Sequence, residues 1–210
     1  MHEISKIIHS LKCKDSYGYD EISSRILKIS APYVLSPPMY IFNKILSTGL
    51  FPESLKFLEV RPLFKKEDIT EFSNYRPISV LTSFTKIVEK IIYKSLYIYL
   101  NDNNILVNDQ YGFTEKLSTE TATYILLNNV LSSLDGRNLA GLFSELHKAC
   151  DCVNHEILLA KMKFYGISGI ANKLMRSYLE NRYQRISMKN SKPNKLSSLS
   201  KSKLANPILC

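Results

Sequence analysis

The side chains best suited to chemistry gather in residues 140–155, AGLFSELHKACDCVNH. The apolar run at residues 140–143 predicts a short strand, and Glu145 stands where that strand would end. Asp151 follows at the entry to a predicted helix. In a strongly basic chain, a carboxylate at a strand end favours a metal ion and a phosphate-bearing substrate, because hard cations take oxygen ligands. Many strands end in an acidic residue, so the signal needs support from the rest of the chain.

The same stretch contains His147, Cys150, Cys152 and His155, whose side chains are of the types that bind zinc. Their spacing lacks the paired CxxC form of structural zinc sites. If the segment is helical, a rotation of about 100° per residue scatters the four side chains around the axis. We therefore favour free thiols and surface imidazoles over a zinc site.

A second chemically useful group lies in a predicted hairpin. Residues 58–64 alternate apolar and charged side chains, a charged turn follows, and residues 74–81 are expected to return as a second strand. Four cations surround this hairpin: Arg61, Lys65, Lys66 and Arg76. Such a surface suits phosphates, because Lys is a mobile point charge and Arg a bidentate donor. The alternative is a solvated hairpin tip, which is the commoner role of an isolated Lys pair.

The composition supports an anionic partner. The chain of 210 residues has 28 Lys and Arg against 19 Asp and Glu, a formal net charge of +9, which favours nucleic acid. The N-terminal residues lack the apolar core of a signal peptide, and no window approaches the ~20 apolar residues of a membrane span. Four irregularly spaced cysteines do not resemble a disulfide framework. We expect an intracellular protein, cytoplasmic or nuclear, without a membrane segment.

The elements that position these groups follow from periodicity. Ser118 is expected to cap a long helix, and residues 182–188 to begin a strand. Pro32, Pro37 and Pro38 bracket a predicted turn, and Gly49 indicates a helix end. The remaining predicted helices cover residues 3–11, 21–29, 40–46, 84–100, 156–164 and 170–179.

Three blocks in this order resemble the reverse transcriptase domain of non-LTR, jockey-like retrotransposons. The resemblance extends over about residues 10–188, and the NYRPIS block with its spacing to the other two is highly specific. The blocks are VRPLFKKED (60–68) with NYRPISVL (74–81), Lys86 and Glu89; DQYGF (109–113) with Ser118 and Thr119; and ELHKACDCVNH (145–155) with residues 165–167 and 177–179.

The resemblance implies an α+β fold, mostly helical with a small, largely antiparallel sheet, and the periodicities agree. This is a partial fingers–palm polymerase fold with no thumb. It implies a helical lead-in at residues 1–57, partial fingers and palm at 58–188, and an irregular Ser/Lys-rich tail at 189–210. The strand at 140–143 is then expected to have an uncovered edge, because this sequence lacks the hairpin that pairs with it in the full fold.

The resemblance also implies site residues. Lys65, Lys66 and Arg76 would hold the triphosphate of the incoming nucleotide or the template backbone. Glu145 stands at the first catalytic carboxylate of the palm, where paired carboxylates hold two Mg²⁺ ions. Cys150 stands where the family has a bulky aromatic residue that discriminates deoxyribose from ribose. The implied partners are an RNA template, a DNA primer and deoxynucleotides.

This sequence departs from the family at several of these positions. Glu145 replaces an aspartate and is one methylene longer, Cys150 is too small to fill the sugar-gate space, and Thr114 replaces a basic residue. No GVPQGS-like loop or Asp-Asp hairpin is present. We therefore expect a fragment of an RNA-directed DNA polymerase that is inactive alone. The alternatives are a nucleic-acid-binding remnant without catalysis and an inert relic of a decayed mobile element.

Overall fold

The computed structural model describes residues 2–65, 68–133, 140–146, 149, 152–186 and 202–203. The chain divides into two compact units, one of Met1–Lys94 with Lys148–Cys210 and one of Ser95–His147. Within the described ranges the helices are α1 (His2–Ser10), α2 (Ser24–Val34), α3 (Ser36–Thr48), α4 (Ser83–Asp102), α5 (Thr119–Ser133), α6 (His155–Phe164) and α7 (Gly169–Leu179). The strands are β1 (Phe57–Phe64), β2 (Tyr75–Val80), β3 (Tyr183–Ile186) and β4 (Ser202–Lys203), and two 3₁₀ turns cover Glu53–Lys56 and Phe72–Asn74.

The helices of the first unit form because their apolar side chains recur every three or four residues and meet in one core. Phe42 of α3 and Ile87 of α4 are at most 1% exposed. Further buried members from α1, α2, α6 and α7 are Ile4, Ile7, Ile8, Leu27, Ala31, Leu159, Leu174, Tyr178 and Leu179. All the predicted helices are present, with shifted ends.

Local signals set the helix ends. Thr82 caps α4 by accepting a hydrogen bond from the amide of Thr85 (3.1 Å), and Ser118 caps α5 by accepting from Thr121 (3.2 Å). Gly49 ends α3 with φ +65°, as predicted. The turn expected between the prolines is confined to Leu35, which separates α2 from α3. Pro32 lies inside α2, and the other two lie in the first turn of α3. Proline fits the first turn of a helix because the amide there has no intrahelical acceptor.

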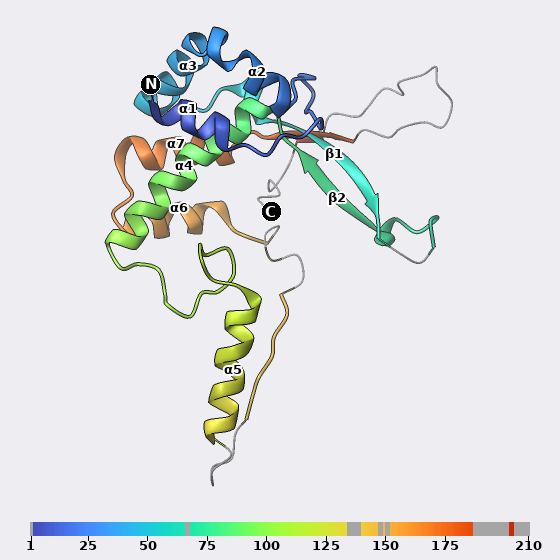
Figure 1. Ribbon diagram of the computed structural model, residues 1–210, viewed down its shortest axis with the longest axis vertical. Coiled ribbons are helices and arrows are strands. Elements are labelled where there is room, and N and C mark those ends of the chain that lie inside the picture. Colours follow the sequence, from blue (N-terminus) through green and yellow to red (C-terminus); the bar gives the residue numbers. More distant parts are fainter. Residues whose placement is uncertain are drawn as a thin grey trace. The chain divides into compact units, whose positions relative to one another are not determined.

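The sheet has the strand order β2-β1-β3-β4. β1 pairs antiparallel with β2 and parallel with β3, and β3 pairs antiparallel with β4. In this register Leu63 lies opposite Arg76, and Glu59 lies opposite Arg185. The α+β class, the predominance of helix and the largely antiparallel sheet are therefore confirmed. Figure 1 shows the β1–β2 hairpin extending away from the helices of the same unit.

The two faces of β1 have different surroundings, because side chains alternate along a strand. Leu58 and Val60 are buried on one face, at 1% and 5% exposure. On the other face Glu59 is buried, whereas Arg61 is half-buried and Leu63 is exposed. That second face contains three of the predicted cations, Arg61, Lys65 and Arg76.

The strand predicted at residues 140–143 is wrong. Residues 140–146 form no strand in the structure, and Leu142 and Phe143 are 96% and 82% exposed. A strand needs a neighbour to complete its backbone hydrogen bonds, and the described residues supply none to this run.

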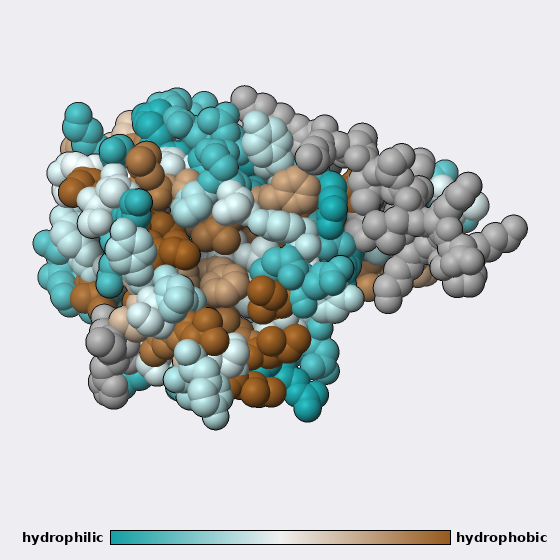
Figure 2. Space-filling view, turned by 90° about the horizontal axis from the view of Figure 1, so that it is seen from above, coloured by the Kyte–Doolittle hydropathy of each residue, from teal (hydrophilic) through white to brown (hydrophobic). Residues whose placement is uncertain are grey.

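Hydrophobic and hydrophilic residues are interspersed on the surface seen from above in Figure 2. Ile29, Tyr33 and Tyr40 of α2 and α3 are among the largely exposed apolar side chains. Among the described residues, no helix combines the length and apolar character needed to cross a membrane.

Candidate nucleic-acid interface

Four cationic residues share the partly exposed face of the sheet, which we call the cationic face: Arg61, Lys65, Arg76 and Arg185. The alternation of β1 and the strand register place them there, because register partners project to the same side. The amide of Lys65 donates to the carbonyl of Asn74 (2.9 Å), which continues the ladder past β1. The predicted hairpin is therefore confirmed, and the structure brings Lys65 and Arg76 together on it.

Lys65 and Arg76 have the most freedom to meet a ligand. Both are exposed, and neither side chain forms a hydrogen bond or ion pair with another described residue. The apolar side chain of Leu63 is a neighbour of both on this face, two residues before Lys65 and opposite Arg76. Lys66, the third predicted contact, lies outside the described residues.

Arg61 is held in place by its neighbours. Its Nη2 lies 3.5 Å from Glu59 Oε1 and donates to the carbonyl of Tyr17 (3.4 Å). The guanidinium also lies over the Tyr17 ring, 5.8 Å from the centroid. Glu59 is nine-tenths buried, so its carboxylate orients the arginine without presenting negative charge to solvent.

Arg185 was not predicted as a site residue. Its guanidinium lies over the ring of Phe57, 5.6 Å from the centroid, and no hydrogen bond joins it to another described residue. The expected strand at residues 182–188 included this arginine. The sequence does not indicate how this strand pairs with β1, so the position of Arg185 beside Glu59 could not be predicted.

The loop between α1 and α2 borders the cationic face. The Tyr19 ring meets Phe57 edge-on at 5.2 Å between centroids, and its hydroxyl donates to the carbonyl of Ser54. Burial, with the nearby Asp20 charge, raises the pKa of Tyr19. A Cβ at Gly18 would lie 2.8 Å from the amide nitrogen of Thr82, so the loop backbone approaches the end of β2 closely.

The hairpin turn is less positive than the strands. Asp68 accepts hydrogen bonds from the Thr70 amide (2.9 Å) and hydroxyl (2.8 Å), which lower its pKa and keep it ionised. Glu71 adds a second exposed carboxylate nearby. The positive potential is therefore expected on the strands and not at the turn.

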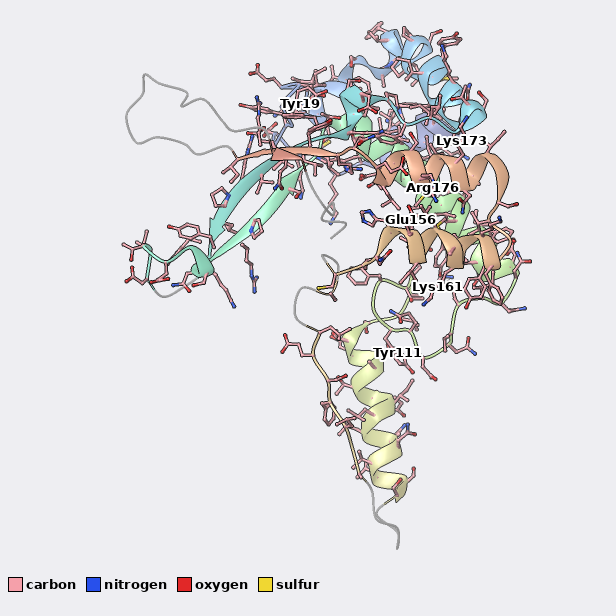
Figure 3. All side chains as sticks on the ribbon, turned by 180° about the vertical axis from the view of Figure 1, so that it is seen from behind. Tyr19, Tyr111, Glu156, Lys161, Lys173 and Arg176 are labelled. Carbon is pink, nitrogen blue, oxygen red and sulfur yellow. The ribbon has the colours of Figure 1, made fainter. Side chains whose placement is uncertain are left out.

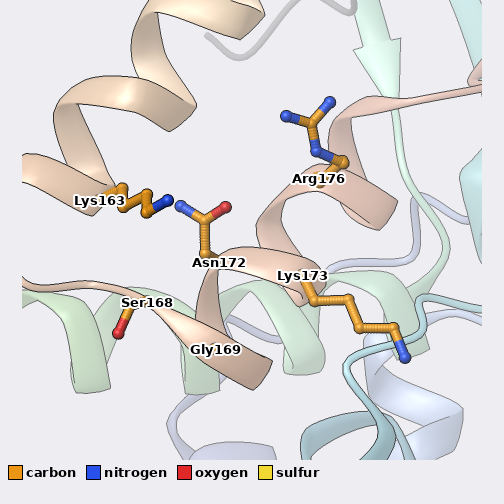
Figure 4. Close-up of a pocket in the computed structure, with 6 residues that line it drawn as sticks. All are labelled: Lys163, Ser168, Gly169, Asn172, Lys173 and Arg176. Carbon is orange, nitrogen blue, oxygen red and sulfur yellow. The ribbon is translucent and has the colours of Figure 1, made fainter.

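The main alternative to the cationic face as a binding site is a cavity of about 360 Å³ next to α7. It is lined by Lys163, Ser168, Gly169, Asn172, Lys173 and Arg176 (Figure 4). Arg176 is neutralised there, since it donates to Glu156 at 2.7 and 3.0 Å and to Glu180 at 3.2 Å. Figure 3 shows Glu156 and Arg176 facing each other from α6 and α7. Lys163 points toward Asn172 and Lys173 points away from it, so the cations do not converge.

The profile of one protein family, described as reverse transcriptase (RNA-dependent DNA polymerase), matches residues 64–200, which is more than half of the chain. The chain belongs to the reverse transcriptase family. The match begins at the end of β1 and includes β2, β3 and all of α4 to α7.

Relatives of this reverse transcriptase chain are transposon proteins. It is 29% identical to the probable RNA-directed DNA polymerase from transposon BS of Drosophila melanogaster, over 91% of this chain and 21% of that protein. It is 28% identical to the RNA-directed DNA polymerase from mobile element jockey of the same fly, over 78% of this chain and 18% of that protein. The jockey protein of Drosophila funebris is 27% identical, over 87% of this chain and 20% of that protein.

The chain therefore spans about a fifth of the length of the relatives that it matches. The resemblance to non-LTR, jockey-like reverse transcriptases is confirmed by these relatives. The activity stated in the names of these relatives is a property of those longer proteins.

Reverse transcriptases typically depend on divalent metal ions, and the described residues offer little to hold them. Glu145 is exposed in a segment without helix or strand. Among the described residues, no group of three or more His, Cys, Asp or Glu side chains could hold a metal ion. One carboxylate does not supply the donor set of a two-metal centre. Cys150, Asp151 and His147 lie outside the described residues.

The structure also joins two residues of the family blocks, Glu89 and Tyr178, with Arg182 in a buried cluster. The Tyr178 hydroxyl donates to Glu89 Oε1 (2.6 Å), linking α7 to α4. Arg182 is 2% exposed, stacks over the Tyr178 ring at 4.5 Å, and donates to the Tyr178 carbonyl (3.4 Å). Burial raises the pKa of Glu89, partly offset by the Tyr178 hydrogen bond and the charges of Arg182 and Lys86. The cluster fixes the chain just before β3.

Proposed function

We propose that this chain is part of the RNA-directed DNA polymerase of a non-LTR, jockey-like retrotransposon, and that its cationic face binds the phosphates of a nucleic acid. Lys65, Lys66 and Arg76 are the proposed contacts, to the template backbone or to the triphosphate of an incoming deoxynucleotide. RNA template, DNA primer and deoxynucleotides are the proposed partners. The proposed regions are a lead-in at 1–57, fingers and palm at 58–188 and a tail at 189–210.

One observation carries the proposal. Lys65 and Arg76 are exposed on the same face of a hairpin, and no described acidic side chain pairs with either. Cations held on a strand pair keep a fixed spacing, so they can meet successive phosphates without first breaking an ion pair. The formal net charge of +9 adds a long-range attraction to the same partner.

Catalysis is the weaker part of the resemblance. Glu145 is proposed at the position of the first metal-binding carboxylate, for Mg²⁺, and Cys150 at the sugar gate. The longer Glu145 side chain misplaces its oxygens, and an error of about 1 Å can cost on the order of a hundredfold in rate. We infer that the chain binds nucleic acid and does not polymerise deoxynucleotides by itself.

The experiment compares the intact chain with the double variant Lys65→Ala/Arg76→Ala, using fluorescence anisotropy of a labelled single-stranded RNA. Loss of two phosphate contacts should weaken binding and reduce the slope of log K against log salt by about 1.4, since each contact on a single strand contributes about 0.7. Lys44→Ala on α3, also exposed, is the matched control.

Equal affinity of the double variant and the intact chain would overturn the binding proposal. A DNA primer, deoxynucleotides and Mg²⁺ added to the same samples should give no extension. Incorporation that disappears in Glu145→Ala would overturn the inference of inactivity and leave the binding proposal unaffected.

A further inference from the structure

Resting on the proposed function, we propose that the ligand of the cationic face is a single nucleic-acid strand that crosses from the β1–β2 hairpin to β3. Arg61 and Arg185 are its further phosphate contacts, and Tyr17 is a surface for base stacking. The binding site then extends well beyond the hairpin that the sequence indicated.

The dimensions of the face favour a strand over a free nucleotide. Lys65, the residue after β1, is six residues from Glu59, which lies opposite Arg185, and this extended segment spans about 20 Å at about 3.3 Å per residue. A stacked single strand advances about 3.4 Å per nucleotide, so it presents about six phosphates over this distance. A deoxynucleoside triphosphate presents three phosphates and can reach only one end of such a face.

The charge distribution also points away from the hairpin turn. The acids of the turn, Asp68 and Glu71, lie beyond the end of β1. Among the described residues of the sheet, Glu59 is the one acidic residue on the cationic face. Its side chain is buried and lies close to Arg61. Glu59 offsets the charge of Arg61, and the remaining positive charge of the face comes from Lys65 and Arg76 at one end and Arg185 at the other.

Aromatic rings accompany the two arginines. Tyr17 is 44% exposed and lies under the Arg61 guanidinium, and Phe57 lies under that of Arg185. Bases of a single strand stack on aromatic rings and on guanidinium planes, whatever their sequence. Paired bases in a duplex are already stacked within the helix and cannot use these surfaces. The arrangement therefore selects single strands.

The test measures binding of the intact chain and its variants to a labelled 12-nucleotide RNA, to the DNA of the same sequence and to a blunt duplex. Arg185→Gln should weaken binding to single strands severalfold and reduce the salt slope by about 0.7, through loss of one phosphate contact. Tyr17→Ala should weaken binding at least about fivefold without changing the salt slope, because a stacking contact involves no counterion. Unlabelled deoxynucleotide should compete poorly with the strand.

Arg25→Gln is the control, since Arg25 is an exposed arginine on α2 that pairs with Asp15 (3.6 Å) and is not part of the cationic face. Arg185→Lys keeps the positive charge, so its binding should retain the salt slope of the intact chain. Thermal melts should confirm that each variant folds. If the Arg185→Gln and Tyr17→Ala variants bind RNA normally while binding by Lys65→Ala/Arg76→Ala is weakened, the proposed path of the strand to β3 is wrong and the proposed function stands. If none of these variants is weakened, both fall. Equal affinity for the duplex would overturn the single-strand specificity alone.

Discussion

Glu89 shows how a single buried residue couples the fold to pH. Its carboxylate accepts from Tyr178 at 2.6 Å, yet burial still raises its pKa above the ordinary value of 4.5. The folded protein therefore binds this proton more tightly than the unfolded chain does. Stability from Glu89 is greatest at acidic pH, falls as pH rises through about 4.5, and is lost above the folded-state pKa.

Glu89→Gln should raise the free energy of unfolding at pH 7.5 relative to the unsubstituted chain, because the amide keeps an acceptor for Tyr178 without a buried charge. The difference should shrink toward pH 4. Urea unfolding across this pH range measures it, with Glu115→Gln, in an exposed turn, as the control. A loss of stability at pH 7.5 would show instead that attraction to Arg182 outweighs the cost of burial.

At the scale of elements, the position of the loop between α1 and α2 depends on one close approach to the backbone after β2. A Cβ at Gly18 would lie 2.8 Å from the Thr82 nitrogen and 3.0 Å from the Leu81 carbonyl carbon. These are backbone atoms at the capped start of α4, so they cannot move aside as a flexible side chain could. The loop that carries Tyr17 and Tyr19 is positioned by this contact.

Gly18→Ala should therefore destabilise the chain by about 1–3 kcal/mol, the usual range for overpacking, and should weaken RNA binding through displacement of Tyr17. A thermal melt and the anisotropy assay measure the two effects. Gly112→Ala is the comparison, since a Cβ there would lie 3.7 Å from its nearest neighbour. Equal melting temperatures for the two variants would contradict the steric argument.

At the scale of the whole molecule, the two units differ in how much they bury. The first contains the hydrophobic core, whereas α5 of the second has no buried residue. Leu127 and Leu131 of α5 are 53% and 61% exposed. A helix of 15 residues without tertiary burial is marginal in water, because helical stability in proteins comes mainly from packing.

Amide hydrogen exchange should therefore be faster throughout α5 than in the α4 turn that contains Ile87 and Val88, which are at most 1% exposed. Exchange followed by mass spectrometry on the intact chain would show this within one sample. Protection of α5 equal to that of this α4 turn would mean that its apolar side chains are covered in solution.

Much of the candidate site could be predicted from the local pattern of apolar and charged residues. The helix at residues 84–100 was readable because its apolar side chains repeat at helical spacing, and Lys65 and Arg76 were placed on one hairpin because they flank a charged turn between two alternating runs. The strand expected at residues 140–143 failed because an apolar run needs a partner strand, which local sequence cannot guarantee.

The sequence by itself determined the family, the helices and the hairpin cations, since each depends on residues close together in the chain. Only the tertiary structure decided that β3 pairs parallel with β1 and places Arg185 beside Glu59. It also decided that Tyr17 meets Arg61. Such pairings join segments far apart in sequence, so no local pattern fixes which residues come together.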